Sequence, residues 1–266
     1  MKIGVFDSGF GGLTVLRALL RHIPGATYAY LGDTARLPYG AKSRATVARY
    51  ATSSARFLVE EEEAEFLVIA CNTASALALD AIREAVSVPV LGVVETGANA
   101  AEANSVTRDV LVIATAATVE SHAYAVACAE RQMRAIEKAC PLLVPLVEEG
   151  WTQHPVTEEV VRIYMGELME QAEDAGMRAD TLVLACTHYP LLRATIEGAV
   201  PPGVRVIDSA EVTAQQVAAR LEGDIRNTGD PQVEFFATDS VTKFRELGTR
   251  FLGQTIPAVR LVDLGG

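Results

Sequence analysis

The sequence lacks any long apolar segment. Hydrophobic residues make up 50% of its 266 positions, yet polar residues interrupt every apolar run before the ~18 residues that a membrane-spanning helix needs. The first seven residues, MKIGVFD, contain no apolar stretch followed by a cleavage site, so we expect no signal peptide and a cytoplasmic location. A chain of this length buries roughly 70–75% of its unfolded surface, so it needs no disulfide or metal ion to fold.

Positive charge is also scarce. The chain has 23 lysines and arginines against 34 aspartates and glutamates, which gives a formal net charge of -11. A nucleic-acid or anionic-membrane partner would need a basic face, so we expect neither. A small anionic substrate is still compatible with this charge, because a few backbone N–H groups at a helix N-terminus can hold an anion locally.

Cysteine occurs at only four positions, Cys71, Cys128, Cys140 and Cys186, and no pair has the C-x-x-C spacing. The usual zinc-ribbon and thioredoxin signatures are therefore absent, and in a reducing cytosol an even number of cysteines does not imply disulfides. Cys128 lies in an alanine-rich stretch and Cys140 directly precedes a proline. We expect both to be small apolar core residues.

Short β-branched runs alternate with amphipathic stretches along the chain. This alternation is typical of βαβ units, in which parallel sheets are covered by helices on both faces. Strands are expected at residues 2–6, 27–31, 65–70, 89–94, 109–114, 142–147, 181–185 and 204–207. Helices are expected at residues 13–22, 43–63, 73–85, 119–139, 157–176, 191–198 and 210–222, and a last strand–helix–strand set within 233–262.

A weak internal repeat suggests that the chain contains two copies of one α/β unit. The segment EFLVIACNT at 65–73 matches DTLVLACTH at 180–188, and residues 2–8 resemble 109–116. The repeat places Cys71 and Cys186 at the carboxyl ends of equivalent strands, which is the edge of an open parallel sheet where ligands bind. The best candidate boundaries between the two units lie at 95–97 and 208–210.

Each of these strand-end cysteines has a hydrogen-bonding neighbour. Asn72 and Thr73 follow Cys71, and Thr187 and His188 follow Cys186. A free thiol is only a few per cent thiolate at pH 7, and a helix N-terminus or a proton-handling neighbour shifts that balance. His188 could assist a proton transfer at Cys186. Asp7, at the end of the first strand, would stand in the corresponding place beside Cys71.

Five motifs carry a resemblance to a known family. They are DSGFGGLTV at 7–15, GDT at 32–34 with LPYG at 37–40, ACNTAS at 70–75, PLVEEG at 145–150, and ACTHYP at 185–190. In this order, and over nearly the whole chain, they resemble the glutamate racemases of the aspartate/glutamate racemase family.

The resemblance implies an α/β fold of two pseudo-symmetric domains with mostly parallel sheets and the active site in the cleft between them. Residues 1–96 plus 210–266 would form one domain and 97–209 the other. The expected activity is a cofactor-independent interconversion of L- and D-glutamate that supplies D-glutamate for peptidoglycan synthesis. The resemblance is also compatible with a homodimer.

By the same resemblance, Cys71 and Cys186 act as acid and base on opposite faces of the substrate Cα, assisted by Asp7 and His188. Together with these last two residues, nine others are expected to bind the substrate or support its binding: Ser8, Tyr39, Gly40, Asn72, Thr73, Thr115, Thr118, Glu149 and Thr187. Pyridoxal phosphate would need a Schiff-base lysine, and none of the four lysines lies at a strand end beside the cysteines.

Three alternatives remain open from the sequence. A related racemase could act on aspartate, because selectivity over one methylene is often only ~1–3 kcal/mol. A metalloenzyme could use Cys71, Cys186 and His188 as zinc ligands, although the spacing signature is missing. A non-catalytic protein could bind a solute between two α/β lobes, but it would have no need for paired strand-end thiols.

Overall fold

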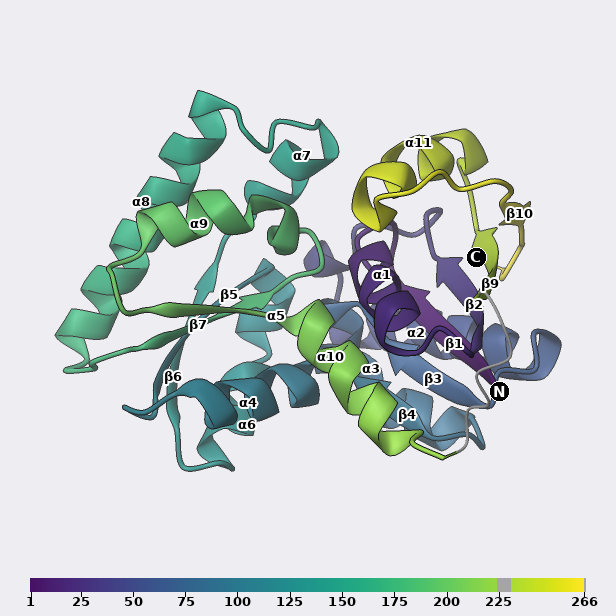
Figure 1. Cartoon of the computed structure of the whole chain (residues 1–266), viewed down its shortest axis with the longest axis horizontal. Helices are drawn as coiled ribbons and strands as arrows, with labels where there is room; N and C mark the ends of the chain where they lie inside the picture. Colours follow the sequence, from purple (N-terminus) through teal and green to yellow (C-terminus); the bar gives the residue numbers. More distant parts are fainter. Residues whose placement is uncertain (224–230, 266) are drawn as a thin grey trace.

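The computed structural model describes residues 1–223 and 231–265, which form two parallel β-sheets covered by helices (Figure 1). The strand order is β10-β9-β2-β1-β3-β4 in the first sheet and β6-β5-β7-β8 in the second. The strands are β1 Lys2–Asp7, β2 Thr27–Gly32, β3 Phe66–Ile69, β4 Val90–Gly92, β5 Asp109–Ala114, β6 Arg134–Ala139, β7 Thr181–Ala185, β8 Arg205–Asp208, β9 Gln232–Ala237 and β10 Arg260–Leu261.

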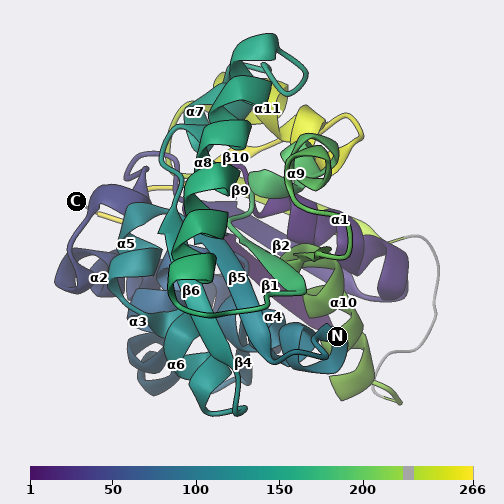
Figure 2. The ribbon, with the colours of Figure 1, turned by 90° about the vertical axis from the view of Figure 1, so that its left-hand side faces the viewer.

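Helices cover both faces of each sheet (Figure 2). They are α1 Leu13–His22, α2 Arg44–Arg56, α3 Asn72–Ala85, α4 Val93–Asn104, α5 Ala116–Glu120, α6 Ala123–Ala129, α7 Leu143–Glu148, α8 Pro155–Asp174, α9 Arg193–Ala199, α10 Ser209–Arg220 and α11 Val241–Leu252. The short turns of helix are η1 Tyr39–Ala41, η2 Phe57–Glu61 and η3 Tyr189–Leu192. Within these described ranges, no helix is long and apolar enough to cross a membrane.

The two sheets share one strand order, which confirms the predicted α/β fold with two equivalent units. The order β2-β1-β3-β4 in the first sheet corresponds to β6-β5-β7-β8 in the second, and β9 and β10 extend the first sheet at one edge. All pairings are parallel, with Phe6 opposite Ile69 and Ala114 opposite Ala185. Because β1 and β3 are neighbours and end at the same edge, Asp7 and Cys71 emerge side by side. The residues after β5 and β7, Thr115 and Cys186, do so in the second sheet.

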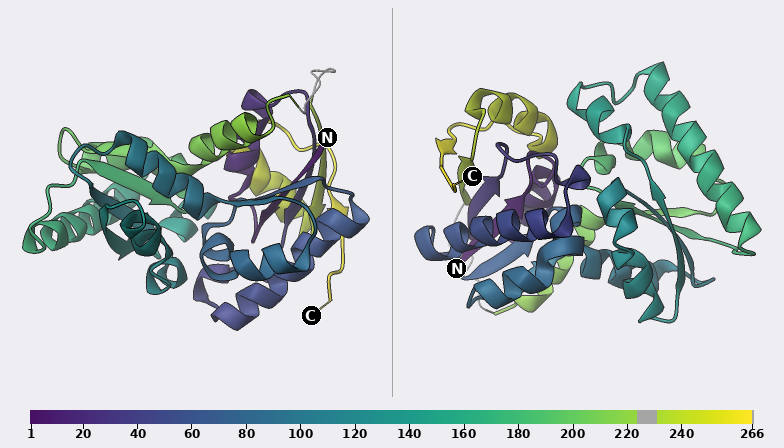
Figure 3. Two further views of the ribbon diagram at one scale, coloured as in Figure 1. Left: turned by 90° about the horizontal axis from the view of Figure 1, so that it is seen from below. Right: turned by 180° about the vertical axis from the view of Figure 1, so that it is seen from behind.

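The apolar strands explain why both sheets lie in the interior. Every residue of β3, β5 and β7 is buried, as expected for parallel strands that helices cover on both sides. The chain passes from the first sheet to the second through α4 and returns through α10. These two helices pack together between the sheets (Figures 1 and 3). Thr96 and Thr213 share a buried hydrogen bond of 2.6 Å between them.

The predicted boundaries can be placed on these elements. The boundary at 96–97 falls inside α4, and that at 209–210 falls at the start of α10. The segment 210–266 that was assigned to the first domain includes residues 224–230 and 266, which lie outside the described residues.

Two predicted elements are wrong. The helix expected at 119–139 is α5, α6 and the edge strand β6, and the strand expected at 142–147 is α7. Strand β6 reads RAIEKA, and its alanine, glutamate and lysine are better helix formers than strand formers. Gln132, with a φ of 58°, ends the helical stretch just before it. Helix α7 tolerates Pro145 because the residue lies in the first turn, where its missing N–H is not needed.

Candidate active site

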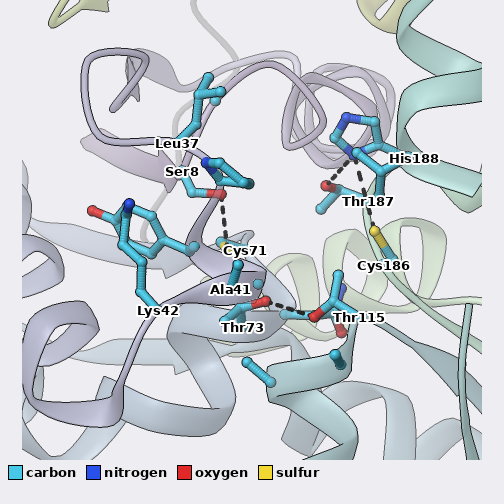
Figure 4. A pocket seen from close by; sticks show the side chains of 18 of the residues that line it. Ser8, Leu37, Ala41, Lys42, Cys71, Thr73, Thr115, Cys186, Thr187 and His188 are labelled. Carbon is cyan, nitrogen blue, oxygen red and sulfur yellow. Dashed lines mark hydrogen bonds between the residues drawn. The ribbon is translucent and has the colours of Figure 1, made fainter. Parts of the chain in front are cut away.

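A cavity of about 540 Å³ lies between the carboxyl ends of the two sheets, and both domains line it (Figure 4). The first domain contributes the turn after β1, the loop around η1 and the start of α3. The second contributes the residues after β5, the α7 region and the residues after β7. The polar and ionisable side chains in its wall are Asp7, Ser8, Tyr39, Lys42, Ser43, Cys71, Asn72, Thr73, Thr115, Glu120, Glu148, Cys186, Thr187 and His188.

Cys71 lies where β3 turns into α3. It is the N-cap of that helix, and its sulfur accepts a hydrogen bond from the Ala74 N–H at 3.4 Å. The thiol donates to Ser8 Oγ at 3.3 Å. Burial and the nearby charge of Asp7 raise the pKa of Cys71 to about 12. The Cys71 side chain is therefore a protonated thiol at neutral pH.

Asp7 is a buried carboxyl group at the end of β1. Its Oδ2 accepts a hydrogen bond from the Gly9 N–H at 2.9 Å, whereas its buried Oδ1 has no partner among the described residues. Burial raises the pKa of Asp7, although the charge of His188 and the backbone N–H groups of the turn oppose that rise. A buried carboxyl group with one unsatisfied oxygen is suited to gaining and losing a proton.

Cys186 follows β7 in the second domain, on the opposite side of the cavity from Cys71 (Figure 4). Its sulfur lies 4.0 Å from Nδ1 of His188, and Nε2 of that imidazole lies 3.2 Å from Oε1 of Glu148. Burial alone would lower the pKa of His188, but the partners Cys186 and Glu148 outweigh it and raise the pKa to about 10. The protonated imidazole supplies positive charge next to the Cys186 sulfur.

All four cysteines are free and buried. Cys128 and Cys140 are fully buried in the core and do not line the cavity, whereas Cys71 and Cys186 both line it. Figure 4 shows the two lining thiols separated by the width of the cavity. A small substrate can therefore reach both sulfurs from opposite sides.

Hydroxyl groups from both domains meet at one wall of the cavity. Thr73 Oγ1 lies 3.0 Å from Thr115 Oγ1 and 3.3 Å from Thr118 Oγ1, and the last two oxygens are 3.0 Å apart. Asn72 Oδ1 accepts a hydrogen bond from the Tyr124 hydroxyl at 2.6 Å, while its Nδ2 has no partner in the described ranges. Such a wall offers hydrogen-bond donors to a carboxylate.

Comparison with known proteins agrees with this geometry. The sequence profile of the Asp/Glu/Hydantoin racemase family matches residues 3–217. The chain belongs to this family. It is 52% identical to the glutamate racemase of Koribacter versatilis, over 99% of this chain and 98% of that one.

Solved glutamate racemases share the fold. A glutamate racemase isoform from Bacillus anthracis superposes with a TM-score of 0.91 at 36% identity, covering 98% of this chain and 97% of the other. The enzyme from Francisella tularensis, solved in complex with D-glutamate, superposes with a TM-score of 0.88 at 35% identity, covering 99% and 97%. This racemase-family chain therefore has the two-domain fold of those enzymes.

The structure gathers most of the site residues expected from the sequence. Asp7, Ser8, Gly40, Asn72, Thr73, Thr115, Thr187 and His188 line the cavity with both cysteines. Thr118 is fully buried behind the wall and joins it through the threonine hydrogen bonds. Tyr39 also lines the cavity, but its hydroxyl donates its proton to Asp33 Oδ2 at 2.5 Å, so it can only accept a hydrogen bond from a ligand.

Glu149 does not line the cavity, and its expected supporting role stays a prediction. It lines a separate hollow with Gly150 and Arg250, and the neighbouring Glu148 contacts His188 instead. Glu148 ends α7 and Glu149 follows it as the C-cap. The strand predicted for this segment does not show which of the two glutamates points towards His188. Asp33, which fixes Tyr39, was also missed, although it belongs to the GDT motif.

Gly11 leaves room for the second-domain part of this racemase-family site. A methyl group on Gly11 would clash with Thr187 Oγ1 and come within 2.7 Å of His188 Nδ1. We expect Gly11→Ala to displace the imidazole and to lower kcat by about 10²-fold, because misplacement by ~1 Å has that cost. Steady-state kinetics would measure this loss. Gly166→Ala is the control, since nothing lies within 4 Å of a methyl group there, and loss of equal size in both variants would contradict the expectation.

The raised pKa of His188 also predicts how stability depends on pH. The pKa is about 10 in the folded protein and 6.5 in the unfolded reference, so folding favours the protonated form. This contribution is complete below pH 6.5 and is lost as the pH rises towards 10. We expect the free energy of unfolding to decrease over this interval, and urea titrations should show a smaller decrease for His188→Asn. His122→Asn is the control, because the His122 side chain is exposed. The backbone of His122 has a φ of 54°, in the left-handed region that asparagine tolerates.

No group of three or more histidine, cysteine, aspartate and glutamate side chains in the described part of the chain is arranged to hold a metal ion. Cys186 and His188 are neighbours, but Cys71 lies across the cavity from them. The geometry thus places two separate thiols around one ligand-sized space, with His188 beside Cys186.

Proposed function

We propose that this protein interconverts L- and D-glutamate without a cofactor, with Cys71 and Cys186 as the acid and base. One observation carries the proposal: the two thiols come from equivalent strand ends of the two domains and line opposite sides of one cavity. Inversion at Cα needs a base on one face and an acid on the other, and this arrangement supplies both. Family membership and the glutamate racemases among the relatives support the choice of substrate.

In the proposed reaction, the Cys186 thiolate removes the Cα proton of L-glutamate, and the Cys71 thiol then delivers its proton to the opposite face. The product is D-glutamate, and the two sulfurs have exchanged protonation states. D-glutamate then reacts in the reverse sense, with Cys71 as the base. No atoms or electrons are gained or lost, and each thiol needs to exchange only one proton.

The electrostatics of the cavity suit Cys71 as the proton donor when L-glutamate reacts. Burial and Asp7 keep Cys71 protonated, with a pKa of about 12, while the protonated His188 stands 4.0 Å from the Cys186 sulfur. Asp7 would assist Cys71 in the other direction by taking up its proton, since burial raises the pKa of Asp7.

The cavity wall can hold the two carboxylates and the ammonium group of glutamate. Ser8, Thr73, Thr115 and Thr187 place hydroxyl groups around the space, and α3 begins beside it with free backbone N–H groups. The Cα–H of an amino acid is far less acidic than a thiol, so hydrogen bonds to the carboxylate must stabilise the developing negative charge. Thr118 and the backbone of Gly40 would support this wall.

Four further predictions accompany this function. We assign residues 1–96 with 210–266 to one domain and 97–209 to the other, which agrees with the strand composition of the two sheets. The D-glutamate would serve peptidoglycan synthesis. A cytoplasmic location and a homodimer also stay predictions.

Polarimetry tests the proposal with purified protein and no added cofactor. Starting from either pure enantiomer of glutamate, we expect the optical rotation to decay to zero, and to decay much more slowly with aspartate. Cys128→Ser should racemise normally, because Cys128 lies outside the cavity. A stable rotation with glutamate but decay with aspartate would support the related aspartate activity, and tight binding without decay would support a binding protein.

A further inference from the structure

The end of α11 packs against the acid–base pair of the other domain. Figures 1 and 2 show α11, from the C-terminal part of the first domain, beside α7 of the second. The Phe251 ring meets the His188 imidazole edge-on, with centroids 5.0 Å apart and an interplanar angle of 76°. Phe251 is 1% exposed and His188 is 9% exposed. The imidazole is therefore confined by an aromatic ring that the second domain does not supply.

Other first-domain groups complete this confinement. A methyl group on Gly11 would lie 2.8 Å from His188 Cε1, so the turn after β1 fits closely against the ring. Thr14 Oγ1 donates to the Thr187 carbonyl oxygen at 3.2 Å. Arg250, next to Phe251, donates from Nη1 to the carbonyl oxygen of Glu148 at 3.3 Å. The backbone on both sides of the His188–Glu148 contact is thus tied to the first domain.

We propose that Phe251 is a positioning residue for proton transfer at Cys186, and that it acts by fixing the orientation of His188. The inference rests on the proposed function and adds to it a residue that never touches the substrate, because Phe251 does not line the cavity. A phenylalanine ring has no group that could move a proton. Its contribution is to keep Nδ1 directed at the Cys186 sulfur while Nε2 holds Glu148.

The contact is present in only one half of the site, and this asymmetry makes it testable. Cys71 instead contacts Ser8 Oγ and the Ala74 N–H at the start of α3. Neither partner is an imidazole that an aromatic ring holds in place. A change at Phe251 should therefore slow transfer at Cys186 and leave transfer at Cys71 unaltered. Since the two enantiomers have equal free energies, kcat/KM must fall equally in both directions, so the asymmetry has to be read from isotope effects.

The experiment compares Phe251→Leu with the unaltered protein, using glutamate deuterated at Cα. We expect kcat to fall about tenfold in both directions, in line with a misplacement of less than ~1 Å. From L-glutamate, Cys186 removes the label, so the substrate isotope effect should increase. From D-glutamate, Cys71 removes it and the slow step becomes reprotonation by Cys186. The substrate isotope effect should then decrease, and the solvent isotope effect should increase.

Controls separate positioning from a general loss of structure. Leu252→Ala truncates the next buried side chain of α11 and should lower the melting temperature without splitting the isotope effects by direction. If Phe251→Leu is not obtained folded, Phe251→Met, which keeps most of the volume, takes its place. Equal changes of the isotope effect in both directions, or an unchanged kcat, would overturn the inference. Failure of the unaltered protein to racemise glutamate would instead overturn the proposed function.

Discussion

Replacing either Cys71 or Cys186 by serine is expected to abolish nearly all racemisation of glutamate. A serine hydroxyl is a much weaker acid than a thiol, so it can neither hold negative charge as a base nor release a proton readily as an acid. Because each turnover uses both sulfurs in the proposed mechanism, we expect either variant to lose at least about 10³-fold in kcat. Polarimetry measures the loss, and Cys128→Ser and Cys140→Ser, both outside the cavity, should keep near-normal rates.

The two serine variants should also differ in the enantiomer from which they fail to remove the Cα proton. Racemisation cannot show this difference, since both directions need both thiols. A glutamate with chloride at C3 can show it, because loss of the Cα proton and of chloride needs only the base on one face. We expect Cys71→Ser to retain elimination from the L-configured compound and to lose it from the D-configured one, with the opposite pattern for Cys186→Ser. Elimination from both compounds by one variant would mean that a single base reaches both faces.

The second large effect is expected at His188 and Asp7, the side chains proposed to assist the thiols. His188→Asn removes the cation beside Cys186, and Asp7→Asn removes the carboxyl group near Cys71. We expect each to lower kcat by roughly 10²–10⁴-fold, the usual contribution of general acid–base assistance, with a much smaller change in KM. Steady-state kinetics in both directions gives the two constants separately.

The separate changes in kcat and KM decide the role of each residue. His122→Asn and Asp239→Asn change the same residue types outside the cavity and should leave both constants almost unchanged. If His188→Asn or Asp7→Asn raised KM and left kcat unchanged, the residue would bind the ligand equally in the ground and transition states. Its role as a proton carrier would then be wrong.

The sequence predicts the parts of the fold and of the site that depend on the strands. The repeat of buried apolar runs marks β3 and β7, and the strand-end positions of Cys71 and Cys186 follow from it. Parallel pairing with short crossovers then brings the ends of β1 and β3 together, so Asp7 could be placed beside Cys71. These inferences succeed because period and register are local properties of the chain.

The remaining parts of the site depend on tertiary packing that no local sequence pattern shows. An apolar run of leucine and valine predicts a strand where α7 lies, so the direction of Glu148, and hence its contact with His188, does not follow from the sequence. Adjacent helical residues differ by about 100° in direction, which explains why Glu149 faces another hollow. The contact of Phe251 with His188 joins segments far apart in the chain and in different domains. An aromatic residue on an amphipathic helix gives no sign of such a partner.

Deuterium incorporation during the first few per cent of reaction in deuterated water tests the two-thiol mechanism most directly. Each enantiomer of glutamate is incubated separately, and substrate and product are separated and analysed for deuterium at Cα. With Cys71 and Cys186 on opposite faces, the proton leaves to one sulfur and a solvent-derived deuteron arrives from the other. The product should then be fully labelled at Cα, while the recovered substrate carries no deuterium, in both directions. Product that retains the substrate's own proton, or substrate that gains deuterium as fast as product forms, would show one base serving both faces and would contradict the mechanism.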